Sequence, residues 1–245
     1  MRLFLTSSPC DDHVPEEFSI PCILNRENGF VDRMSEEWKP ESRGLIISAD
    51  PDNSALNDEM KDTFREAFAF HGLSLSRMLI CDSRNETEAA ALIAQSDMII
   101  LAGGHVPTQN AFFRRIGLKE LIRDFPGTVM GISAGTMNCA DIVYAQPEEE
   151  GESVDPAYKR FIPGLALTDI MVLPHYQKVK DYYLDGKRLY EDITYGDSMG
   201  RKFYVLVDGS YVLVQDGKTV ICGLAYLISD GMITQICSEG EQLKL

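Results

Sequence analysis

The sequence predicts an α/β three-layer sandwich whose central sheet is mostly parallel, followed by a C-terminal antiparallel β-meander. Three observations predict this fold. Short apolar runs alternate with helical patterns over residues 2–173. The runs are apolar throughout, as expected for strands buried on both faces of a parallel sheet. Toward the C-terminus, Asp-Gly pairs separate β-rich runs, which is a strong hairpin signal.

The apolar runs and the helical patterns give the order of elements in the parallel part of the fold. Six strands are expected, at Arg2–Thr6, Gly44–Ser48, Met78–Cys81, Met98–Leu101, Thr128–Gly131 and Ile170–Leu173. Helices are expected from the capping cluster at Asp52 to Gly72, over Glu86–Gln95, from Pro107 to before Pro126, and over Thr136–Tyr144. This alternation favours right-handed crossovers between neighbouring parallel strands.

The C-terminal part changes character at about the point where the Asp-Gly pairs begin. Meander strands are expected at Lys202–Val207, Tyr211–Gln215, Thr219–Cys222 and Met232–Ile236, extending one edge of the sheet. Two polar segments, Asp11–Glu41 and Gln146–Pro163, show no regular pattern and are expected to be long loops. Because there is neither an internal repeat nor a low-complexity linker, we expect a single domain over residues 1–245.

Composition and charge exclude several classes of function. Of 245 residues, 23 are Lys or Arg and 38 are Asp or Glu, which gives a formal charge of −15. This balance is opposite to what nucleic-acid phosphates or an anionic membrane surface require. No apolar stretch approaches the length of a transmembrane helix, and the N-terminal segment does not resemble a signal peptide. The six cysteines form no CxxC pair, so we expect reduced thiols in a cytoplasmic protein.

The sharpest motif is Gly131-Ile132-Ser133-Ala134-Gly135, which follows an apolar strand and precedes a helical pattern. A tight strand-to-helix turn of this kind exposes the serine hydroxyl, and small residues flank it because strand and helix nearly touch. We therefore interpret Ser133 as a catalytic nucleophile. The amide of Ala134, at the start of the helix, can stabilise a developing oxyanion. The alternative is a purely structural role, as a glycine-rich turn with an N-capping serine.

A serine nucleophile requires a base, and the chain has four histidines. His13 lies in the polar N-terminal segment, and His71 precedes Gly72 at a helix end. His175 follows the apolar run Ile170–Leu173, at the carboxyl edge where α/β sheets place their sites. It is therefore the candidate base.

A glycine pair follows another strand at the same edge. Gly103 and Gly104 come directly after Met98–Leu101 and Ala102, and such glycines let a backbone amide approach a ligand closely. Gly104 is the candidate second oxyanion donor. Gly103, His105 and Gln109 are the candidate substrate-binding residues, because the segment that carries them borders the expected pocket. For His105, a loop histidine without a role is the alternative.

These motifs together resemble the peptidase E (aspartyl dipeptidase) and cyanophycinase family of serine peptidases. The motifs are the strand and Ala-Gly-Gly at Leu101–Gly104, the turn Gly131–Gly135, and Leu-Pro-His-Tyr at Leu173–Tyr176. The resemblance covers most of the chain and implies a class I glutamine-amidotransferase-like, flavodoxin-like fold. It implies Ser133 as nucleophile, His175 as base, the amides of Gly104 and Ala134 as oxyanion hole, and no metal or organic cofactor. It also implies cleavage of short peptides or isopeptides with an acidic residue, preferably Asp.

The third catalytic group has two candidates. The dipeptidase branch carries its acid in the loop after the elbow helix, which favours Glu148. The cyanophycinase branch carries a glutamate after a later strand, where this chain has Asp208 in an Asp-Gly turn. The sequence prediction is Glu148, with Asp208 as the alternative. The chain departs from the dipeptidase pattern at His105, where that branch has Asn.

Other functions remain open at this point. An α/β-hydrolase esterase shares the G-x-S-x-G turn, but it places its histidine later and carries an HGGG-type loop that is absent here. A glutamine amidotransferase needs cysteine at the position of Ser133. A non-catalytic small-molecule binder on the same fold is the third alternative. The expected partners are a short peptide substrate and, through an edge of the meander, a second copy in a homodimer.

Overall fold

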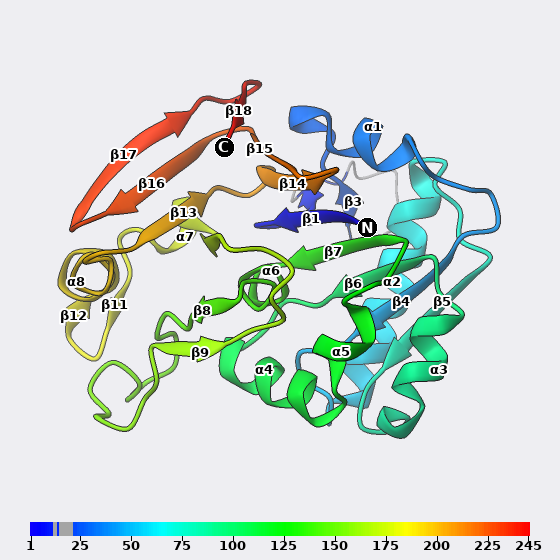
Figure 1. Ribbon diagram of the computed structural model, residues 1–245, viewed down its shortest axis with the longest axis horizontal. Helices are drawn as coiled ribbons and strands as arrows, with labels where there is room; N and C mark the ends of the chain where they lie inside the picture. Colours follow the sequence, from blue (N-terminus) through cyan, green and yellow to red (C-terminus); the bar gives the residue numbers. More distant parts are fainter. Residues whose placement is uncertain (12–13, 15–21) are drawn as a thin grey trace.

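The computed structural model describes residues 1–11, 14 and 22–245. Its centre is an eight-stranded sheet with the strand order β18-β15-β14-β1-β7-β6-β4-β5 (Figure 1). The bounds of these strands are β1 Arg2–Thr6, β4 Arg43–Ile47, β5 Arg77–Cys81, β6 Met98–Leu101, β7 Thr128–Ile132, β14 Tyr211–Gln215, β15 Lys218–Cys222 and β18 Gln242–Lys244. β1, β7, β6, β4 and β5 run parallel, whereas β14, β15 and β18 add antiparallel strands beside β1.

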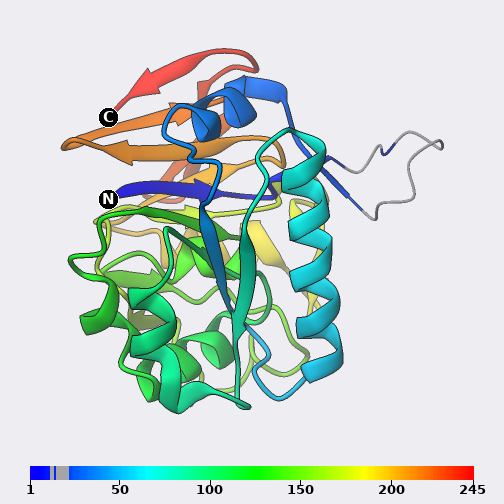
Figure 2. The same cartoon turned by 90° about the vertical axis from the view of Figure 1, so that its right-hand side faces the viewer.

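Helices cover both faces of this sheet, which makes the three layers that the sequence predicts (Figure 2). One face carries α1 Phe30–Ser35 and α2 Ser54–Phe70. The other carries η2 Glu86–Glu88 with α3 Ala89–Ala94, α4 Val106–Arg115, α5 Leu118–Ile122 and α6 Ala134–Met137. The α/β class, the mostly parallel sheet and the C-terminal antiparallel strands are therefore confirmed.

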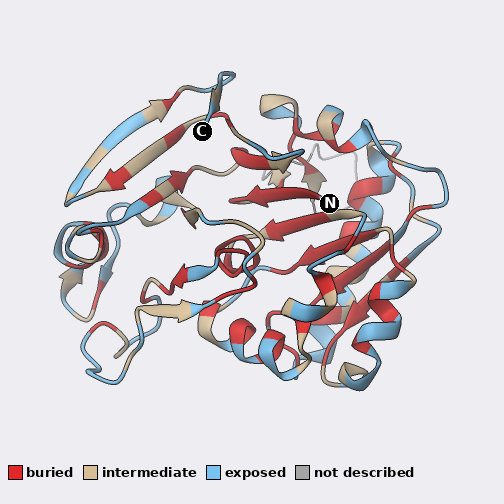
Figure 3. Cartoon of the chain, viewed as in Figure 1, coloured by how far each residue is buried: buried red, intermediate tan, exposed pale blue. Residues whose placement is uncertain are grey.

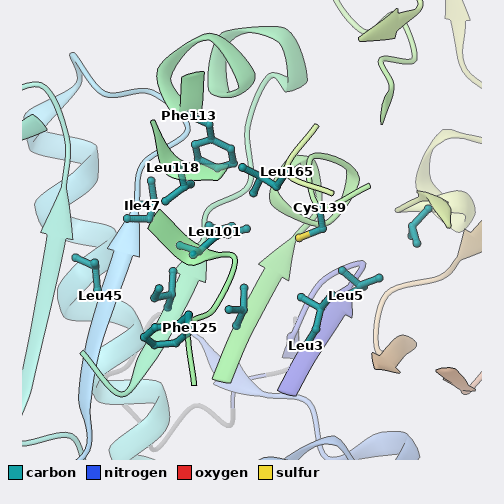
Figure 4. Close-up of a cluster of buried hydrophobic side chains, with 14 of the residues drawn as sticks. Leu3, Leu5, Leu45, Ile47, Leu101, Phe113, Leu118, Phe125, Cys139 and Leu165 are labelled. Carbon is teal, nitrogen blue, oxygen red and sulfur yellow. The ribbon is translucent and has the colours of Figure 1, made fainter. Parts of the chain in front are cut away.

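The parallel strands are apolar throughout because alternate side chains enter two different cores. In β1, Leu3 and Leu5 pack under α3, α4 and α5, whereas Phe4 packs under α1 and α2. The first core, with Phe113 and Leu118 above the sheet, is drawn in Figure 4. In Figure 3 the central strands are almost entirely buried, while β17 at the periphery is largely exposed.

A second, four-stranded sheet was not expected. Its order is β10-β13-β16-β17, with bounds Met171–Leu173, Lys202–Leu206, Ala225–Ser229 and Met232–Cys237. The expected meander is thus divided, because β14, β15 and β18 extend the main sheet while β13, β16 and β17 leave it (Figure 1). The predicted strand at 170–173 also joins this second sheet, where β10 pairs in parallel with β13.

Local predictions failed where an element is short. The helix expected over Thr136–Tyr144 ends at Met137, and β8 Ile142–Tyr144 follows and pairs with β9 Phe161–Pro163. The apolar residues of β8 had suggested one continuous amphipathic helix. In the expected N-terminal loop, β2 Cys10–Asp11, β3 Ile23–Leu24, η1 Glu27–Gly29 and α1 are regular, while His13 lies outside the described residues. The remaining elements are α7 Tyr176–Val179, β11 Tyr183–Leu184, β12 Lys187–Arg188, η3 Leu189–Thr194 and α8 Tyr195–Asp197.

Within the described residues, no helix has both the length and the apolar character needed to span a bilayer.

Candidate active site

Ser133 occupies a strained turn between β7 and α6. Its backbone angles, φ 49° and ψ −111°, lie outside the regions that residues other than glycine usually adopt. The Ser133 amide donates to the carbonyl oxygens of both Thr6 and Ser7, at 3.2 Å each, which ties the turn to the end of β1. The strain is therefore held by neighbouring backbone, as expected for a nucleophile elbow.

The two flanking glycines are required by close packing. A Cβ atom on Gly131 would lie 2.7 Å from the Thr136 backbone, and a Cβ atom on Gly135 would lie 2.1 Å from the Leu101 carbonyl oxygen. No side chain can be added at these distances without moving backbone. The two glycines of the Gly-x-Ser-x-Gly pattern are therefore needed because the strand and the helix are in direct contact.

The glycine loop after β6 lies beside Ser133. A Cβ atom on Gly103 would be 3.5 Å from the Ser133 Cβ, and one on Gly104 would be 2.7 Å from the Ala49 side chain. Within the described part of the chain, neither the Gly104 amide nor the Ala134 amide has a hydrogen-bond partner. Both amides are thus without a partner among the described residues, and their role as oxyanion donors stays a prediction.

His175 is paired with Asp208. The His175 Nδ1 atom lies 2.6 Å from Asp208 Oδ1. The two side chains come together because β10 and β13 are parallel neighbours, so that the residues following them meet at one edge of the second sheet. His175 itself has a left-handed backbone, with φ 59°, at the start of α7.

Two further residues, Ser7 and Lys178, hold this pair, and the sequence analysis did not identify Ser7 as part of the site. The Ser7 hydroxyl donates to Asp208 Oδ1 at 2.7 Å and accepts from the His175 amide at 2.7 Å. Lys178 Nζ lies 2.9 Å from Asp208 Oδ2. Burial alone would raise the pKa of Asp208, but the hydrogen bonds from His175, Ser7 and Lys178 outweigh it and hold this pKa well below its usual range.

Glu148 does not contact His175, which corrects the sequence prediction of the third catalytic group. Its carboxylate accepts from the backbone amide of Val106 at 3.2 Å, at the start of α4. The loop after α6 therefore places Glu148 at the start of α4. Asp208, the alternative, is the carboxylate that the geometry places on the histidine.

A pocket of about 220 Å³ joins the candidate catalytic residues. Ser133, His175, Gly104 and Glu148 line it, and the rest of its wall is largely apolar, with Val106, Met137, Pro147, Pro174, Val179, Tyr182 and Leu189. No hydrogen bond joins Ser133 to His175 among the described contacts. Such bonds are often long in the absence of a substrate and shorten when it binds.

A wider pocket of about 670 Å³ begins on the other side of the same glycine loop. Gly103, Gly104 and His105 line it together with Ala49, Asp50, Leu56, Asn57, Glu59, Met60, Thr63, Thr108 and Glu149. Gly104 is the residue that lines both pockets. Gly103 and His105 thus border a pocket, and their role in binding substrate stays a prediction.

Gln109 is not exposed to either pocket, contrary to expectation. Its side chain is fully buried, donating to the Ala102 carbonyl at 2.6 Å and accepting from Asn138 Nδ2 at 3.0 Å. The polar side chain thus braces the start of α4 against the glycine loop. The segment that carries Gln109 borders the wider pocket at His105, but the Gln109 side chain itself faces inward.

One group among the described residues has the composition of a metal site. The ligand atoms of His105, Glu149 and Glu152 lie within 4.8 Å of one another. However, Glu152 Oε1 is already 2.8 Å from His105 Nε2, and its Oε2 accepts from the amides of Glu148 and Glu149. These contacts explain the arrangement as a brace of the loop that borders the wider pocket.

Comparison with known proteins identifies a peptidase family. The sequence model of peptidase family S51 matches residues 51–222, which is more than half of the chain. A crystal structure of a peptidase from an acI-B1 actinobacterium aligns with a TM-score of 0.65 at 16% identity, covering 100% of this chain and 96% of that one. A putative peptidase E protein from Listeria monocytogenes aligns with a TM-score of 0.58 at 13% identity, covering 96% and 98%. No curated protein sequence matches.

Proposed function

Because the chain belongs to peptidase family S51 and is a serine peptidase, we propose that it cleaves short peptides through an acyl-enzyme formed on Ser133. The observation that carries this proposal is the pairing of His175 with Asp208 at 2.6 Å, in a pocket that Ser133 also lines. Nucleophile, base and orienting acid are three groups that serine acyl transfer needs.

Each group has a definite role in this mechanism. The His175 Nε2 atom accepts the proton of the Ser133 hydroxyl as its oxygen attacks the scissile carbonyl. Asp208 accepts a hydrogen bond from Nδ1, which fixes the ring and stabilises the imidazolium that forms. The amides of Gly104 and Ala134 donate to the oxyanion. The imidazolium then protonates the leaving amine, and water releases the acyl group by the reverse sequence.

A fluorophosphonate probe tests the nucleophile directly. We expect one label per chain on Ser133, found by peptide mapping, and none on Ser133→Ala. Ser54→Ala is the matched control, because Ser54 is an exposed serine at the start of α2. Labelling of Ser133→Ala to the level of the wild type would exclude Ser133 as the nucleophile. It would indicate a hydrolase with a different nucleophile, whereas a wild type that does not label at all would indicate a non-catalytic binder.

The side chain that the substrate presents is the second part of the proposal. A preference for Asp, which the resemblance implies, needs a cation at the pocket. None of the residues that line the two pockets is Lys or Arg, and the wider pocket carries Asp50, Glu59 and Glu149. Among the basic residues that follow the glycine loop and His175 in the sequence, Arg115 contacts Glu86 and Lys178 contacts Asp208.

We therefore favour a substrate that presents a neutral or cationic group to the wider pocket, with the Asp-specific dipeptidase as the second candidate. A dipeptide library separates the two. Faster release from Arg-Xaa or Leu-Xaa than from Asp-Xaa supports the first candidate, and the opposite ranking supports the second. Hydrolysis of simple alkyl esters without any peptide hydrolysis would contradict both candidates.

A further inference from the structure

Two cysteines near the start of the chain are in contact outside the candidate active site. Cys10 is the first residue of β2, and Cys22 directly precedes β3. Their sulfur atoms are 3.0 Å apart, and both side chains are half-buried. The sequence analysis treated all six cysteines alike, because residues 10 and 22 are not a recognised motif and are separated by a polar segment.

The strand pairing explains why the two sulfur atoms meet. β2 and β3 are antiparallel, with Cys10 opposite Leu24 and Asp11 opposite Ile23. Cys22 lies two residues from Leu24, so its side chain is on the same face as that of Cys10. Diagonal neighbours of this kind are within reach of each other across an antiparallel pair.

We propose that Cys10 and Cys22 are a reversible oxidation site that forms an intramolecular disulfide. A disulfide has a sulfur–sulfur distance of ~2.05 Å, so the two sulfur atoms need to approach by about 1 Å. The ends of the segment are already paired by the β2–β3 ladder, and closing the bond therefore requires only a local adjustment.

The chemistry balances with a peroxide as the oxidant. The Cys22 thiolate attacks one peroxide oxygen, the O–O bond breaks, and the leaving oxygen takes up a proton as water. The Cys10 sulfur then attacks the resulting sulfenic acid, the S–O bond breaks, and a second water leaves with the Cys10 proton. Two thiols and one hydrogen peroxide thus give one disulfide and two waters.

The order of attack follows from the contact between the two thiols. A hydrogen bond from Cys10 lowers the pKa of the Cys22 thiol, and this effect exceeds the opposing effect of burial. Cys22 is therefore the better source of thiolate, and Cys10 is the resolving thiol.

The other four cysteines provide the contrast that makes the proposal selective. Cys81, Cys139, Cys222 and Cys237 are all buried. Burial raises the pKa of each of these thiols, that of Cys81 to about 12. Oxidation of the folded protein should therefore consume two thiols and leave four.

The location of the pair connects it to the catalytic machinery. Ser7, which holds both His175 and Asp208, lies three residues before Cys10. Between them, the Ser8 carbonyl accepts from the amide of Gly209, the residue after Asp208, at 3.3 Å. A disulfide at Cys10 therefore constrains the segment whose preceding residues, Ser7 and Ser8, contact the His175–Asp208 pair and the turn after it.

Thiol counting on the full folded chain tests the proposal without any measurement of activity. The protein is treated with hydrogen peroxide, alkylated under denaturing conditions and digested after glutamate. Cleavage at Glu16 or Glu17 separates the two cysteines, so their fragments stay joined only through a disulfide. We expect two of the six thiols to be lost, a joined Cys10–Cys22 fragment, and full recovery of thiols with dithiothreitol.

Three variants complete the experiment. Cys10→Ser and Cys22→Ser should each abolish the joined fragment while circular dichroism shows an unchanged fold. Cys237→Ala, the matched control, should still form it. The proposal is overturned if the wild type forms a disulfide between chains, links any of the four buried cysteines, or retains all six thiols. Because labelling of Ser133 is measured separately, failure of this proposal and failure of the proposed function are distinguishable.

Discussion

Replacing Asp208 by asparagine removes the negative charge of the proposed third catalytic group and keeps the size and shape of the side chain. The amide oxygen of the new side chain can still accept the hydrogen bond from His175 Nδ1, which in the wild type is 2.6 Å long. What the variant loses is the negative charge beside the imidazolium that forms during attack. The histidine takes up its proton during attack, so the loss falls mainly on the transition state.

The magnitude follows from Coulomb's law. Two unit charges whose centres lie ~4 Å apart interact by about 4 kcal/mol at an effective dielectric constant of about 20. Both side chains are mostly buried, with exposed fractions of 29% for His175 and 12% for Asp208, so this dielectric constant is appropriate. Each 1.4 kcal/mol in the barrier is about tenfold in rate, and the expected fall in turnover is about 10³-fold.

The assay is the release of free amino groups from the best dipeptide of the library, with kcat and KM determined separately. We expect Asp208→Asn to lower kcat with little change in KM, because the group acts through the histidine and not on the bound substrate. Glu148→Gln is the matched control and should reduce kcat less than about tenfold. If Glu148→Gln is as damaging as Asp208→Asn in folded protein, the assignment of the acid from this geometry is wrong.

Three further outcomes test other parts of the structure. Ser133→Ala should lower turnover by about 10³-fold or more at an unchanged melting temperature, measured with the same dipeptide. Gly135→Ala should lower the free energy of unfolding, measured by urea titration, by about 3 kcal/mol or more, because its Cβ would lie 2.1 Å from the Leu101 carbonyl oxygen. An unfolding midpoint equal to that of the wild type would show that the turn at Ser133 can relax. The folded-state pKa of Asp208 is depressed, so its stabilisation is complete above the unfolded-state pKa of ~3.9 and is lost as pH falls below it. The difference in unfolding free energy between wild type and Asp208→Asn should therefore shrink between pH 5 and roughly pH 2 in denaturant titrations, and a constant difference would contradict this linkage.

The turn that carries the proposed nucleophile, Ser133, could be located from the sequence because its requirements are local. The glycines on either side of Ser133 are needed for contacts within a few residues or with the adjacent strand, so the motif itself carries the information. The same holds for β1 and β6, two parallel strands whose bounds agree with the predicted runs. A parallel strand that is buried on both faces has a composition that few other elements share.

The partner of the histidine could not be located in this way. Asp208 and His175 meet only because β10 leaves the main sheet to pair with β13, and no local pattern records that pairing. Asp208-Gly209 also has the sequence of an ordinary tight turn, which it shares with the turns at Asp216 and Asp230. The inward direction of Gln109 likewise depends on Asn138, which follows α6 and is distant in sequence.

The division of the site between two sheets has a mechanical consequence. Ser133 is carried by β7 of the large sheet, whereas His175 and Asp208 follow two adjacent strands of the small one. Ser7 follows β1 of the large sheet, and its hydroxyl bonds both His175 and Asp208. A single hydroxyl group therefore couples the position of the histidine and its acid to the sheet that carries the serine.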